Sequence, residues 1–193
     1  PAGRGVIFRD DIATLLEELG TAIPSVFEAE DYRARRQAID EAFKERQEEA
    51  FEALQERARE FDIALVRTQM GFALAPMKDG DVIAPEAFKE LDEAARDKFE
   101  ADLEVLQREL QETVQQLPVW DKERRERIRD LNREVTMYAV GHSIDALRDA
   151  YDEFPRVTEY LTALQGDVVS NADAFMSSED AGSQLQALAA MKQ

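Results

Sequence analysis

An eleven-residue spacing of apolar side chains constrains the fold of this chain more than any other feature. Two interleaved sets recur at this interval: Tyr32, Phe43 and Leu54, and Ile39, Ala50 and Phe61. An eleven-residue repeat corresponds to about 3.67 residues per turn, close to a straight α-helix, so its apolar stripe hardly drifts. The sequence therefore predicts a long, straight, amphipathic helix over about 29–61, with charged sides facing water.

A second apolar series predicts a partner that runs back along this helix. Its members alternate spacings of three and four: Phe99, Leu103, Leu106, Leu110, Val114 and Leu117. That alternation is typical of a coiled-coil seam. Pro85 suits the first turn of the returning helix, because the N–H groups of a first turn have no partner within the helix and proline lacks this N–H. Pro118 is predicted to interrupt it.

The segment 63–83, between these two helices, is predicted not to be helical. Its β-favouring residues, Gly71 and an Asp79-Gly80 turn predict strands near Ile63–Gln69 and Phe72–Met77, with a short third strand at Asp81–Ile83. A lone hairpin is marginal in water. We therefore expect this one to pack on the helices or to touch another part of a larger protein.

The remaining helices are predicted to form a small bundle. Asp10 or Asp11 caps a short helix that Gly20 ends, and Pro24 breaks the pattern. A long helix follows from about 121 to 154, and a shorter one follows Pro155. The expected fold is mainly α: a long antiparallel, coiled-coil-like helical arm with a β-hairpin at its tip and a helical bundle at its base.

The expected domain organisation follows from these elements. Residues 1–176 form one helical domain, in which the arm covers about 29–117, the hairpin covers 63–83, and the base covers 1–28 and 119–176. A flexible linker or tail is expected over 177–193, where the sequence becomes small and polar. Because the chain begins at Pro1, without an initiator methionine, we expect it to be a segment of a longer polypeptide.

Charge and composition narrow the classes of partner. The chain has 42 acidic and 24 basic side chains, a net charge of −18. A surface this negative repels phosphate, which disfavours nucleic acid and anionic membrane as partners. No apolar run is long enough to span a bilayer, and the absence of cysteine fits a reducing compartment. The predicted location is the cytoplasm.

No catalytic constellation can be assembled from the sequence. His142, the single histidine, continues the row of Leu131, Val135 and Tyr138 and is expected to be packed or half-buried. A zinc site would then depend on carboxylates alone, which zinc seldom uses, so no metal or other cofactor is assigned. The acid pairs and the run from Lys122 to Arg129 alternate with opposite charges and fit solvated helix faces. The segment is predicted not to be an enzyme.

Met70, Phe72 and Met77 lie in or beside the predicted hairpin. One interpretation is that they fasten the hairpin to the helices. The other is that Met70 and Phe72 form an exposed, adaptable surface for unfolded polypeptide, as flexible methionine-rich surfaces do elsewhere. These three residues are the candidate contacts with substrates or partners.

Three stretches carry a family resemblance: PAGRGVIFRDDIATLLEELGTAIPSVFEAEDY, EAFKERQEEAFEALQERAREFDIALVRTQMGFALAPMKDGDVI and RDLNREVTMYAVGHSIDAL. In this order, they resemble the helical domain that interrupts the AAA+ region of Lon-related (LonC-like) ATP-dependent proteases. The resemblance runs from Pro1 to about Phe175. PMKDGD superficially echoes the context of a Lon catalytic serine, but Asp81 and Val82 stand where proline and serine should be. No catalytic residue is carried over.

The resemblance implies a non-catalytic domain of a Lon-like serine endopeptidase, in which ATP is bound outside this segment. It also implies a ring, a homo-hexamer, in which the domain touches unfolded protein substrates, other domains and neighbouring subunits. Its expected role is substrate engagement, gating or subunit arrangement in protein degradation. The alternative is a purely structural coiled-coil module that sets the oligomeric state and makes no substrate contact.

Overall fold

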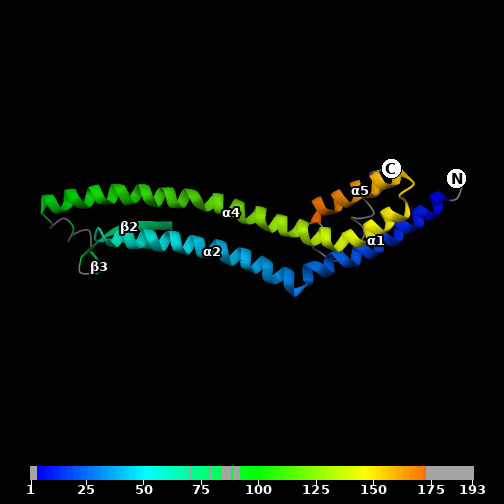
Figure 1. Cartoon of the computed structure of the whole chain (residues 1–193). Coiled ribbons are helices and arrows are strands. Elements are labelled where there is room, and N and C mark those ends of the chain that lie inside the picture. The colour runs from blue at the N-terminus through cyan, green and yellow to red at the C-terminus, as the bar shows by residue number, and fades with distance from the viewer. Residues whose placement is uncertain (1–3, 70, 79, 84–87, 89–91, 173–193) are drawn as a thin grey trace. The chain divides into compact units, whose positions relative to one another are not determined.

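The computed structural model describes residues 4–69, 71–78, 80–83, 88 and 92–172. The described elements are α1 (Arg4–Glu28), α2 (Glu30–Arg59), β1 (Ile63–Thr68), β2 (Gly71–Lys78), β3 (Asp81–Val82), α4 (Glu93–Ala150) and α5 (Pro155–Ser170). The chain is mainly helical, with a small antiparallel sheet that comes between the long helices α2 and α4 in the chain (Figure 1). The predicted fold class is confirmed. Met70, Asp79, Pro85 and 177–193 lie outside the described residues.

The eleven-residue pattern marks the buried side of α2. Tyr32, Phe43 and Leu54 are each at most 5% exposed, and the interleaved set is half-buried. The helix has Glu30 and Asp31 in its first turn and basic residues in its last. Charges of these signs at these ends interact favourably with the helix dipole. The predicted helix over about 29–61 is confirmed.

Two prolines that were expected to break helices lie inside them. α1 continues through Gly20 and Pro24, and α4 continues through Pro118. Proline inside a helix removes one hydrogen bond and crowds the preceding turn, at a cost of about 3 kcal/mol. Burial of neighbouring side chains offsets this cost: Ile23 and Phe27 flank the first proline, and Trp120 lies two residues after the second. The predicted helix ends at Gly20 and before Pro118 are therefore wrong.

The buried side of α4 also departs from the predicted rows. Val114 is 43% exposed and Tyr138 is 85% exposed. The buried row passes instead through Trp120 in one stretch and through Val140 and Ile144 in the other. Rows of three- and four-residue spacing cross on a helix, and the position of the packing partner decides which of them is covered.

The structure divides into two compact units, which comprise residues 1–39 with 125–193, and residues 40–124. In the first unit, α1, α5 and the adjoining parts of α2 and α4 share one core. Its fully buried members include Leu19, Ile23, Ile144, Leu161 and Leu164. The Tyr32 hydroxyl donates a hydrogen bond to Asn132 Oδ1 at 2.8 Å inside this unit.

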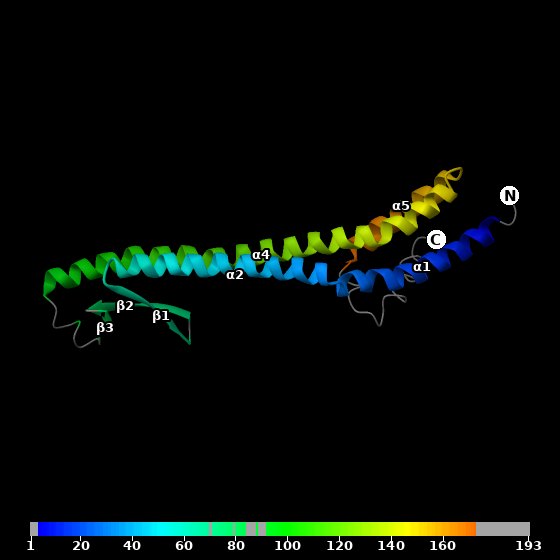
Figure 2. The same cartoon turned by 60° about the horizontal axis from the view of Figure 1, so that its bottom comes forward.

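In the second unit the sheet packs on the paired parts of α2 and α4 (Figure 2). Its core consists of Leu54, Ala58, Ile63 and Leu106. The strand order is β1-β2-β3, and both pairs are antiparallel. The predicted strands are confirmed, and each predicted end lies within one residue of the observed end. Asp62, at φ 55°, makes the turn from α2 into β1.

Candidate binding surface

One face of the sheet is fastened to the helices. Ile63, Leu65 and Leu74 pack in the core of the second unit. The Phe72 ring stacks on Phe51 of α2, with ring centroids 4.3 Å apart and planes 21° apart. We call this side the inner face; by strand alternation it consists of Ile63, Leu65, Arg67, Phe72, Leu74 and Pro76.

The opposite face carries small and aliphatic side chains and no charge. We call it the outer face; it consists of Ala64, Val66, Thr68, Gly71, Ala73, Ala75, Met77 and Val82. Val66 is 37% exposed and Val82 is 52% exposed. Successive side chains on a strand point to opposite sides, so these residues share the side that faces away from the helices. On a chain with a net charge of −18, these two exposed valines make the outer face the candidate contact surface.

The structure separates the residues that the sequence grouped as a contact site. Phe72 lies on the inner face, where its ring stacks on Phe51 of α2, and it is 36% exposed. Met77 lies on the outer face opposite Val82, and Met70 is not among the described residues. Sequence reasoning missed Val66 and Val82. The first four residues of IALVRT are all apolar, so both faces of β1 carry apolar side chains, and only the position of the helices shows which face is free.

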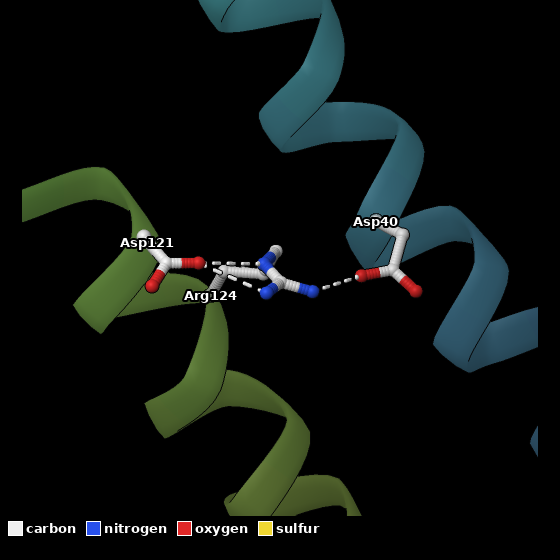
Figure 3. Close-up of polar contacts among 3 residues, drawn as sticks. All are labelled: Asp40, Asp121 and Arg124. Carbon is white, nitrogen blue, oxygen red and sulfur yellow. Dashed lines mark hydrogen bonds and ion pairs between the residues drawn. The ribbon is translucent and has the colours of Figure 1, made fainter. Parts of the chain in front are cut away.

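Ion pairs fix the helices on which the sheet rests. Arg124 of α4 donates to Asp40 of α2 at 2.9 Å and to Asp121 of its own helix at 2.9 Å (Figure 3). These hydrogen bonds raise the pKa of Arg124 above its ordinary value. Arg46 of α2 pairs with Glu123 at 2.8 Å. In this part of the basic run, the arginine charge is used for packing between helices.

Arg46 also covers the indole of the same unit. Its guanidinium lies 4.8 Å from the centroid of the Trp120 ring, and Trp120 is 7% exposed. Arginine is well suited to this position because its planar group can form an ion pair and stack on an aromatic ring together. The Arg46 charge is thus paired within the protein.

A groove of about 750 Å³ lies between α1 and α4 in the first unit. Asp11, Glu18 and His142 contribute to its lining. His142 is exposed, so the prediction that it is packed or half-buried is wrong. Tyr151 directly follows the last residue of α4, and its hydroxyl donates to Asp11 Oδ2 at 2.6 Å.

The groove shows no assembled reaction centre among the described residues. The Thr14 and Thr21 hydroxyls donate to backbone carbonyls of their own helix, and none of the hydrogen bonds found in this part of the chain involves His142. A nucleophile held by a general base requires such a bond or a close approach. Within the described ranges there is also no cluster of three or more metal-ligating side chains, and no helix is long and apolar enough to cross a membrane.

Comparisons with known proteins return no relative: no family model matches the chain, and no curated protein or solved structure matches it significantly.

Proposed function

We propose that this chain is a non-catalytic helical domain of a Lon-like ATP-dependent serine protease and that its outer face engages unfolded protein substrates. The observation that carries the proposal is the uncharged, partly exposed outer face on a strongly acidic chain. The resemblance of the three quoted stretches to the Lon-related helical domain supports the choice of parent. ATP binding and peptide-bond cleavage belong to other parts of that parent.

Physical chemistry favours an unfolded polypeptide as the partner of this face. Burial of apolar surface contributes about 25 cal/mol per Å², and unfolded chains expose apolar side chains that folded proteins hide. Val66, Ala73 and Val82 offer such surface without a charge that must lose its water. The surrounding negative charge disfavours nucleic acid and favours segments that carry lysine or arginine.

Binding to the 193-residue chain tests this proposal directly. The probe is fluorescein-labelled lysozyme that has been reduced and alkylated so that it cannot refold. Combined Val66→Lys and Val82→Lys substitutions place charge on the outer face and are expected to weaken binding by at least about tenfold. The matched control is Val105→Lys with Val119→Lys, which changes two valines of α4 that are 39% and 47% exposed. Equal affinity of both variants and the native chain would contradict the proposal.

A second test uses the full-length protease that the proposal implies. Deletion of Ala64–Ile83 removes the sheet and is expected to slow the degradation of unfolded protein, while cleavage of small peptides continues. Unchanged degradation of unfolded protein, with unchanged peptide cleavage, would rule out a role in substrate engagement.

A structural coiled-coil module that only sets subunit association is the second candidate. The observation that favours it is the exposure of Val105, Val114 and Val119 along α4, which could pack on a neighbouring subunit. Sedimentation of the chain with and without the unfolded lysozyme separates the two functions. Self-association without binding of the unfolded protein would favour the structural module.

A further inference from the structure

The pairing of β1 with β2 leaves one edge of β1 open. In an antiparallel pair, residues that exchange hydrogen bonds alternate with residues whose N–H and C=O groups point away from the partner strand. The register identifies the two sets. Met77 N–H donates to the Asp62 carbonyl at 2.7 Å, and the next pair, Ile63 with Pro76, contains a proline that has no N–H to donate.

This alternation places the backbone groups of Leu65 and Arg67 on the outward edge. Their partners across the hairpin are Leu74 and Phe72, two and four residues from Pro76. Among the described residues, the hydrogen bonds found outside the strand pairs do not involve Leu65 or Arg67. Leu65 is half-buried and Arg67 is exposed, and within the described part of the chain no strand lies on the other side of β1.

Proteins usually protect such an edge with charges, prolines, bulges or a covering segment, because its unpaired groups form a template for another strand. β1 has a single charged residue, Arg67, and no proline. Its backbone is regular, and the Cα pairing with β2 runs without a bulge from Ile63 to Thr68. The edge is thus suited to strand addition, the mode by which several peptide-binding domains hold extended ligands.

We propose that an extended, apolar polypeptide segment with basic flanks pairs with the outward edge of β1 as a fourth strand, with alternate side chains beside Val66 on the outer face. This inference rests on the proposed function and specifies how the substrate is held. Backbone hydrogen bonds are common to all sequences, so this mode would let one site hold many different unfolded segments.

Charge selects a basic segment rather than a second copy of this chain. Arg67 on β1 and Lys78 on β2 disfavour basic side chains within the added strand itself. The exposed side of α2 close to Phe51 carries Glu48, Glu49 and Glu52, which favour basic side chains beyond its ends. A second copy would bring another net charge of −18 to the same place. Lysine or arginine beyond the ends of an apolar segment would instead be attracted by the acidic helix.

The Arg67→Pro substitution tests the edge from the side of the protein. Proline at this position removes an outward N–H and places its ring on the open edge. The hydrogen bonds between β1 and β2 stay intact, because the N–H of Arg67 points away from β2, as the proline nitrogen does at Pro76. Arg67→Ala is the matched control, because it removes the charge and keeps the N–H. The probe is a fluorescein-labelled peptide of alternating valine and threonine with lysines at both ends. We expect Arg67→Pro to weaken its binding by about tenfold relative to Arg67→Ala.

The Gly71 and Gly80 amide signals in a two-dimensional NMR spectrum check that the hairpin of the proline variant is intact. Both glycines have positive φ, 124° and 91°, so their signals are sensitive to the turns that join the strands. Equal binding by the Arg67→Pro and Arg67→Ala variants, with these signals unchanged, would overturn strand addition.

A second measurement leaves the protein unaltered. In two versions of the peptide, complementary sets of alternate amides are replaced by esters, which removes N–H donors and keeps every side chain. Strand addition requires at least one version to bind about tenfold more weakly than the parent peptide. Full affinity of both versions would overturn it.

The outcomes separate this inference from the proposed function. Binding that survives ester replacement but is lost with Val66→Lys and Val82→Lys would contradict strand addition and keep the outer face as the substrate site. A peptide with glutamates in place of the lysines should bind more weakly at low salt; equal binding would contradict the charge argument. Concentration-dependent dimerisation that Arg67→Pro abolishes, without peptide binding, would assign the edge to a second copy and overturn the proposal.

Discussion

At the scale of single residues, the buried hydrogen bond between Tyr32 and Asn132 is the sharpest test of packing in the first unit. Both residues are 3% exposed, and their side chains are 2.8 Å apart. Tyr32→Phe removes the donor and leaves buried Asn132 Oδ1 without this bond, so we expect a loss of about 1–3 kcal/mol in the free energy of unfolding. Urea denaturation measures it.

The double variant Tyr32→Phe with Asn132→Leu provides the control for that measurement. Removal of both partners replaces a polar pair by apolar groups, which costs less than leaving one partner unsatisfied. The double variant should therefore be more stable than the sum of the two single effects predicts. Strict additivity would show that the hydrogen bond contributes little.

Tyr151 makes the stability of the first unit depend on pH. Its hydrogen bond to Asp11, at 2.6 Å, and then its burial raise the pKa of the phenol above the ordinary value of 10.0. Only the protonated phenol can donate, so this contribution is complete below about pH 10 and is lost as the pH rises through the folded-state pKa. The stability difference between the native chain and Tyr151→Phe should therefore shrink above about pH 10 in urea titrations. A difference that stays constant with pH would contradict this assignment.

At the scale of elements, Pro118 is a defect that α4 tolerates. The residue is exposed and interrupts the hydrogen bonding of a 58-residue helix. Pro118→Ala restores one backbone donor and relieves the clash with the preceding turn, so we expect the free energy of unfolding to rise by about 1–3 kcal/mol. Guanidinium denaturation followed by circular dichroism checks it. A destabilised variant would show that a bend at Pro118 is needed to seat Trp120.

The elements also show how far the sequence could predict this fold. The eleven-residue spacing located the buried side of α2 because one helix carries the whole signal, and β-favouring residues with Gly71 and a turn located the strands. Whether a helix continues through Pro24 or Pro118 depends on the burial of neighbouring residues such as Ile23 and Trp120. That information lies in the packing partner and not in the local sequence.

Which face of the sheet the helices cover could not be predicted from the sequence, for the same reason. Phe72 and Met77 both belong to β2, but they lie on opposite faces of the sheet because they are five positions apart, an odd number, along the strand. The assignment of one face to the helices follows from contacts such as Phe51 with Phe72. The ion pair between Asp40 and Arg124 joins residues 84 positions apart, and no local pattern indicates it.

At the scale of the whole molecule, each unit has a hydrophobic core of its own, and separate cores favour separate unfolding. Trp120 is the single tryptophan and lies in the second unit, so its fluorescence reports the unfolding of residues 40–124. Leu106→Ala and Leu164→Ala each empty a fully buried position, at a cost of about 2–5 kcal/mol. We expect Leu106→Ala to lower the urea midpoint of Trp120 fluorescence.

Leu164→Ala, in the core of the first unit, should leave the midpoint of Trp120 fluorescence unchanged. It should lower the urea midpoint of the part of the circular dichroism signal that comes from the first unit. However, α2 and α4 are continuous through both units, and an intact helix can carry cooperativity from one core to the next. The two variants decide between these effects. If Leu164→Ala lowers the Trp120 midpoint as much as Leu106→Ala does, helix continuity dominates and the units unfold together. If only Leu106→Ala does so, the separate cores dominate, and the sheet with its outer face is held by the second unit alone.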